Sequence, residues 1–127
     1  MDTEERSTAK SAGGVAPEDY AIFQDHGYRG LYGGLTLRDI HKRRGLKKTQ
    51  QVLDHMGSTE IAANLFRATQ TQEKLRRDRI TGKKRVNRTH FDVGAKVRKT
   101  IEELGGTMPE NLPPAESIKK LESKRRR

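Results

Sequence analysis

The sequence contains no cysteine and no tryptophan, and only 5% of its residues are aromatic. Without cysteine the chain can form neither a disulfide framework nor a zinc site built on thiolates. No apolar run approaches the roughly 20 residues that a membrane-spanning helix needs. The first residues, MDTEERSTAK, lack the apolar core of a signal peptide. These absences favour a soluble cytoplasmic protein without a membrane partner.

Charge is what the chain has in abundance. Of its 127 residues 35% are charged and 31% hydrophobic, and the formal net charge is +10. Such a composition predicts a modest core with disordered ends. Residues 74–99 hold eleven lysines and arginines against Asp78 and Asp92, a net charge of +9. This block indicates a polyanionic partner, of which nucleic acid is the commonest; a solvated basic face is the alternative interpretation.

The longest helical pattern runs from Ser58 to Arg79. Ser58 is suited to cap this helix, and Glu60 is suited to its first turn. We expect one stripe of the helix to be buried, namely Ile61, Leu65, Ala68, Gln72 and Leu75 with Ala62, Phe66 and Thr69 alongside. The opposite face would then lie in solvent, with Asn64, Arg67, Gln70, Glu73, Lys74 and Arg77. The stripe would serve an intramolecular core or a partner helix in a homodimer equally well.

Apolar and polar residues never alternate beyond a few positions, so we predict an all-α fold of about five or six helices. Residues 1–16 would be a disordered lead, 17–106 the helical domain, and 107–127 an extended proline-containing segment followed by a basic helix and tail. A helix from Pro17 should fray in the run HGYRGLYGGL, because glycine is a poor helix former. A later helix, capped by Thr89 and packed through residues including Leu104, should end at Gly105 and Gly106.

The segment Thr36–Met56 resembles a helix-turn-helix in outline, with Gly45 in the turn. His41 and Gln51 stand where that motif needs a small and an apolar residue. We therefore favour a simple helical hairpin, with a DNA-reading transcriptional regulator as the alternative.

Two groups of basic residues are the candidate contacts to nucleic acid. The first surrounds the turn of the hairpin: Arg43, Arg44, Lys47 and Lys48. The second group lies at the end of the central helix and along the following segment, Thr81–Arg88, which we expect to be a mobile basic loop. Its members are Arg76, Arg77, Arg79, Lys83, Lys84, Arg85 and Arg88. With so few aromatic side chains for stacking, binding should be electrostatic and sensitive to salt.

The sequence offers no pattern typical of catalysis. The four histidines, His26, His41, His55 and His90, are not spaced as metal ligands, and no serine or cysteine nucleophile stands in a recognisable turn. His90 with Asp92 is too little for a metal-assisted phosphodiester site. We therefore expect no metal, no cofactor and no catalytic residues.

The runs DHMGSTE, AANLFRATQT and ELGGTMPE lie in a stretch, about Ala16 to Leu121, that resembles the C-terminal half of the bacterial DNA-damage-inducible protein D (DinD) family. Nothing in the chain corresponds to the BRO-type N-terminal domain of that family. The resemblance implies a non-enzymatic, nucleoid-associated protein of the SOS response. It also implies a partner, the RecA filament on single-stranded DNA. The protein would modulate this filament as a negative regulator.

Overall fold

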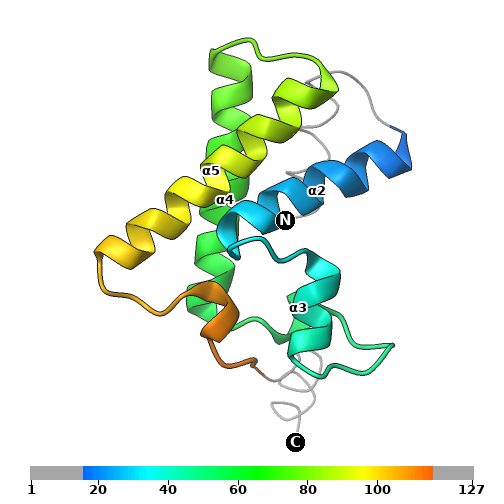
Figure 1. The fold of residues 1–127 in the computed structure, drawn as a ribbon, viewed down its shortest axis with the longest axis vertical. Coiled ribbons are helices and arrows are strands. Elements are labelled where there is room, and N and C mark those ends of the chain that lie inside the picture. The colour runs from blue at the N-terminus through cyan, green and yellow to red at the C-terminus, as the bar shows by residue number, and fades with distance from the viewer. Residues whose placement is uncertain (1–15, 116–127) are drawn as a thin grey trace, which may run out of the picture.

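The computed structural model describes residues 16–115. Its elements are α2 (Pro17–Leu31), α3 (Leu37–Arg43), η1 (Val52–His55), α4 (Ser58–Arg77), α5 (Lys83–Glu103) and η2 (Pro109–Asn111). Figure 1 shows α2 and α5 crossing α4, with α3 and both 3₁₀ turns towards one end of the molecule. No strand occurs between residues 16 and 115, which confirms the all-α prediction, although the α-helices there number four rather than five or six.

Helix α2 continues through Gly27 and Gly30, where we expected it to fray. Both glycines lie where α2 crosses α5. A Cβ atom on Gly30 would collide with the carbonyl oxygen of Phe91, and one on Gly94 would lie 2.7 Å from the carbonyl oxygen of Gly27. The absence of side chains lets the two backbones touch, and this packing offsets the low helix propensity of glycine. The helix ends instead at Leu31, and Gly33 and Gly34 follow with φ values of +65° and +103°.

Helix α3 begins as predicted, with Thr36 and Asp39 forming a capping box. The prediction of a second helix before Met56 is wrong, because only the single 3₁₀ turn η1 forms there. The side chain of His41 bonds the carbonyl oxygen of Gln50 at 2.8 Å, and the Gln50 amide oxygen accepts from the backbone N–H of Lys47 at 2.7 Å. These local bonds provide hydrogen-bond partners for the backbone groups of an irregular segment. The helix-turn-helix-like pair is therefore absent.

Helix α4 buries Ala68 and Leu75, as predicted, but it also buries Asn64 and Arg67, which we expected in solvent. Its buried residues are Glu60, Asn64, Arg67, Ala68, Thr71 and Leu75. The apolar side chains expected in the core are instead 37% exposed at Ile61, 44% at Leu65 and 56% at Phe66. The helix also starts one residue earlier than predicted, with Gly57 rather than Ser58 in the capping position.

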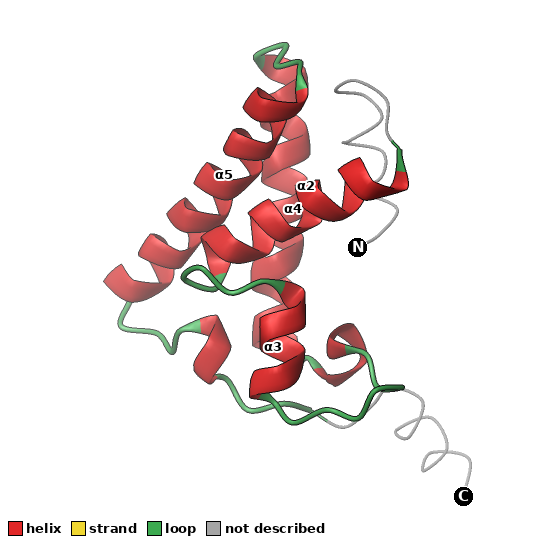
Figure 2. Ribbon diagram, turned by 45° about the vertical axis from the view of Figure 1, so that its right-hand side comes forward, coloured by secondary structure: helices red, strands yellow, loops and turns green. Residues whose placement is uncertain are grey.

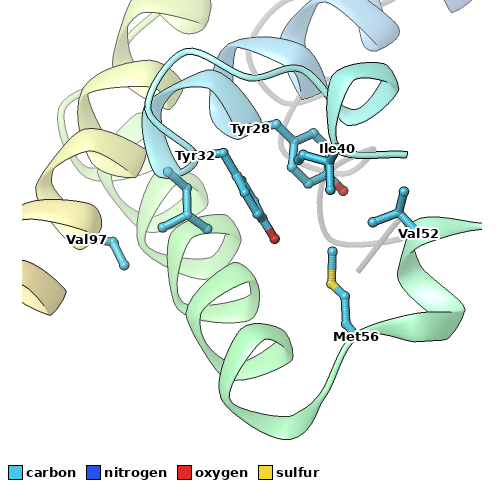
Figure 3. Close-up of a cluster of buried hydrophobic side chains, with 7 residues drawn as sticks. Tyr28, Tyr32, Ile40, Val52, Met56 and Val97 are labelled. Carbon is cyan, nitrogen blue, oxygen red and sulfur yellow. The ribbon is translucent and has the colours of Figure 1, made fainter. Parts of the chain in front are cut away.

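The apolar core therefore comes mainly from other elements. One cluster contains Tyr28, Leu31, Tyr32, Ile40, Val52, Met56 and Val97, and the other contains Phe23, Leu75, Ile80 and Val86. Figure 3 shows Tyr28 beside Ile40, with Val52 and Met56 facing them from the segment before α4. Leu104, which we expected to pack against α5's other apolar residues, is 81% exposed.

The segment after α5 packs back onto the helices. Helix α5 ends at Glu103, and Gly105 follows with a φ of +73°, as its sequence predicts. Pro109 is buried, and Arg98 forms two bonds of 2.7 and 2.8 Å to the carboxylate of Glu110. Figure 2 shows this segment returning towards α3. The expected disordered lead and C-terminal basic helix lie outside the described residues, apart from Ala16.

Candidate nucleic-acid interface

The turn between α4 and α5 carries the second group of predicted basic residues, but it is not the mobile loop that we expected. Helix α5 begins at Lys83, with Gly82 at its cap and a φ of +89°, so Thr89 lies inside the helix rather than at its start. Ile80 and Val86 are buried against Phe23 and anchor the turn from both sides. As a result, Lys84 and Arg88 lie one helical turn apart on the same face.

Some of these cations are paired and others are not. Arg77 bonds Glu73 at 2.7 Å, Lys83 pairs with Asp19 at 2.9 Å, and Arg88 pairs with Asp92 at 3.1 Å. Four exposed residues have no carboxylate partner between residues 16 and 115: Arg76, Arg79, Lys84 and Arg85. Hydrogen bonds from Lys74 and Arg77 hold the pKa of the Asp78 carboxyl below its ordinary value, so Asp78 is ionised at neutral pH. Even so, positive charge prevails at this end of the molecule.

The first predicted group is divided by the fold. The side chain of Arg44 is buried and pairs with Glu60 at 2.8 Å, so its guanidinium faces the interior rather than a phosphate outside. Arg43 donates to the side chain of Asn111 at 2.8 Å, while Lys47 and Lys48 are exposed. Figure 1 shows the end of α3 and the α4–α5 turn at opposite ends of the molecule. The structure therefore does not join the two groups into one surface.

A hollow of about 520 Å³ between α2 and α5 adds His26, Arg29, Asn87 and Phe91 to the predicted Lys84 and Arg88. Its lining consists of His26, Arg29, Lys84, Asn87, Arg88 and Phe91. On each helix these residues recur at spacings of three and four, which places them on one face. Only the crossing of the two helices brings the faces together, so no local signal in the sequence could have identified the hollow.

A chain of buried polar groups runs through the interior from the end of α3 to α5. The Glu60 carboxylate accepts from the Tyr32 hydroxyl and from Arg44, and the side-chain amide of Asn64 donates to the Tyr32 oxygen at 2.9 Å. Arg67 donates to Asn64 at 3.1 Å and bonds Nε2 of His90. We call these six residues the polar seam. Burial and the Glu60 carboxylate raise the pKa of Tyr32, which therefore remains a donor.

The seam has the character of a structural network. The side chains of Arg44 and Glu60 are 4% and 1% exposed, and Tyr32, Asn64, Arg67 and His90 are exposed by 1% or less. A substrate could not reach these groups without unpacking the helices. No cluster of three histidine, cysteine or acidic side chains suited to a metal occurs between residues 16 and 115.

His90 lies at the α5 end of the seam and should make stability depend on pH. Its Nδ1 donates to the carbonyl oxygen of Phe23 at 2.7 Å, so its Nε2 is left to accept from Arg67. Burial, and then the positive charge of Arg67, hold the pKa of His90 well below 6.5, so the native imidazole is neutral. The unfolded chain binds a proton near pH 6.5, which the native protein does not.

We therefore expect the free energy of unfolding to fall as pH drops below about 6.5, with His90 contributing up to about 1.4 kcal/mol per pH unit. Urea unfolding at pH 7.5 and 5.0, for the parent and for His90→Gln, measures this contribution. The variant should lose less stability between the two pH values, since glutamine does not titrate. Equal losses in the two proteins would show that His90 is not the group responsible.

Comparison with known proteins places the chain in a family. The model of the DinD C-terminal domain matches residues 1–121, so the chain belongs to that family. It is 66% identical, over 116 residues, to the DNA damage-inducible protein D of Escherichia coli (strain K12). The match covers 91% of this chain and 42% of that protein, so the chain spans about two fifths of its relative's length. No solved structure gives a significant match. None of the described helices is long and apolar enough to cross a membrane.

Proposed function

We propose that the protein is a non-enzymatic component of the DNA-damage response that binds RecA filaments on single-stranded DNA and limits their activity at the nucleoid. The observation that carries this proposal is the basic end of the molecule, which comprises the end of α4, the α4–α5 turn and the first two turns of α5. The connection to DNA damage comes from the protein's membership of the DinD family and from the name of its relative.

The chemistry of this basic end favours a flexible polyanion. Arg76, Arg79, Lys84 and Arg85 are exposed and point to no carboxylate in the described part of the chain. Lysine and arginine that neutralise phosphates release counterions, so affinity should fall steeply as salt rises. Contacts to the backbone alone carry no sequence information. A protein that binds in this way can compete for the strand within a filament without reading its sequence.

The proposal is tested by adding the protein to preformed RecA filaments on single-stranded DNA and following both filament disassembly and strand exchange. We expect strand exchange to slow as protein is added, with filaments shortening in parallel. Strand exchange and filament length unchanged at saturating protein would contradict the proposed function.

Removing four charges from the basic end should weaken binding. We expect Lys83→Ala, Lys84→Ala, Arg85→Ala and Arg88→Ala together to reduce affinity for single-stranded DNA about tenfold or more at moderate salt, and to flatten the salt slope by about 3 units at most. Titration of a fluorescent oligonucleotide at several salt concentrations measures both quantities. Helix content should hardly change, because alanine is a good helix former.

A matched control removes four exposed charges from the opposite end of the molecule: Arg38, Lys42, Lys47 and Lys48. Both variants lower the net charge equally, so any difference between them reports position. If both weaken binding to the same extent, the contact is not located at the basic end.

A further inference from the structure

The hollow between α2 and α5 combines positive charge with an aromatic ring. Arg29, Lys84 and Arg88 line it, and no carboxylate does so among the described residues. The nearest acidic group on α5 is Asp92, which pairs with Arg88 at 3.1 Å. The lining therefore suits an anion of more than one charge.

The aromatic ring in the hollow is held in place by the helix crossing. Phe91 is partly buried, and its carbonyl oxygen lies directly against Gly30 of α2. The Arg88 guanidinium carbon lies 5.9 Å from the centre of the Phe91 ring, within the range of a cation–π contact. The ring therefore already carries one planar group, the guanidinium, which shows that a flat group can lie over it. His26 is fixed as well, because its Nδ1 donates to the carbonyl oxygen of Ile22 at 2.8 Å, which leaves Nε2 for another partner.

We propose that this hollow is a subsite for one unpaired nucleotide of single-stranded DNA, with its base stacked against Phe91 and its flanking phosphates held by Arg29, Lys84 and Arg88. The inference rests on the proposed function and adds to it the position of a base. The volume of about 520 Å³ lies within the usual range of small-ligand sites. Duplex DNA could offer only its phosphates here, because its bases are already stacked on one another.

The first experiment separates base stacking from phosphate contact. Phe91→Leu keeps an apolar side chain of similar size but removes the ring. We expect it to weaken binding of a thymidine oligonucleotide about tenfold, since stacking of a single base on an aromatic side chain contributes on that scale. Binding of an abasic strand of the same length, and of a duplex, should be unchanged. An equal loss of affinity for the thymidine and abasic strands would overturn the proposal.

The second experiment compares two pairs of charges. Arg29→Gln with Lys84→Gln removes two cations from the hollow, whereas Arg76→Gln with Arg79→Gln removes two exposed cations outside it. The first pair should weaken binding of the thymidine oligonucleotide more strongly than the second. If a poly-glutamate peptide of equal charge displaces the oligonucleotide as well as a second oligonucleotide does, the hollow is a general anion site and the proposal fails.

Crosslinking locates the base directly. A strand carrying 5-iodouracil, irradiated in complex with the parent protein, should label the tryptic peptide of residues 89–96, which contains Phe91. Labelling confined to other peptides would refute the subsite while leaving the proposed function intact. A parent protein that binds no single-stranded DNA would overturn the subsite, whereas the proposed function would still be judged by strand exchange on filaments.

Discussion

Replacing Glu60 with alanine should destabilise the protein by about 3–5 kcal/mol, because removing one partner of a buried ion pair leaves the other charge uncompensated. The charge left behind would be the Arg44 guanidinium, which is 4% exposed. The Tyr32 hydroxyl would lose its acceptor in the same step. Urea or thermal unfolding at pH 7.5, followed by circular dichroism, measures the loss.

Two further variants make this result interpretable. Glu73→Ala removes a carboxylate from the same helix, but its pair with Arg77 is half exposed, so the cost should stay below about 1 kcal/mol. Combining Arg44→Met with Glu60→Leu removes both charges, and it should recover much of the stability that Glu60→Ala loses. A double variant no more stable than Glu60→Ala would show that the pair does more than balance charge.

Alanine in place of Gly30 should cost about 3 kcal/mol, near the upper end of the usual range for overpacking. The new Cβ would collide with the Phe91 carbonyl oxygen and would lie 2.9 Å from the backbone nitrogen of Ala95. Both are backbone atoms, so relief requires that α2 and α5 move apart. The same unfolding measurement detects the loss.

Gly57→Ala is the matched control for the crossing. Nothing lies within 4 Å of a Cβ at this position, and its φ of −76° suits any residue. Only the weak preference of a helix cap for glycine over alanine is lost, so the cost should not exceed about 1 kcal/mol. If both substitutions cost the same, close approach of the backbones does not explain the glycines of α2.

The sequence predicts the class of fold, the starts of α2 and α3 and the end of α5, because capping and turn signals are local. For α4 it correctly predicts that Ala68 and Leu75 are buried, but it misses the burial of Asn64 and Arg67, for a reason that concerns particular partners. Asn64 and Arg67 are buried because Tyr32 and His90 meet them from other elements. The spacing of apolar residues along one helix contains no information about polar partners from distant elements. It therefore predicts that Ile61 and Leu65 lie in the core.

The site was predicted in part. The sequence identifies Lys83, Lys84, Arg85 and Arg88 as candidates, but the lack of an apolar run predicts a loop for their segment. Lysine and arginine are nevertheless good helix formers, and Ile80 and Val86 supply the anchor from outside that run. Arg29 and Phe91 were missed because their proximity depends on the glycine crossing, which brings together residues about sixty positions apart.

The return of the chain along η2 has a practical consequence for anyone who divides this protein into pieces. Arg98 and Glu110 form a partly buried pair, and the backbone N–H of Ala115 bonds the carbonyl oxygen of His55 at 2.6 Å. A fragment cut after the double glycine would remove the carboxylate partner of Arg98 and expose the surface that Pro109 covers. The smallest piece worth expressing therefore extends through Ala115, and a fusion partner or affinity tag belongs beyond that residue.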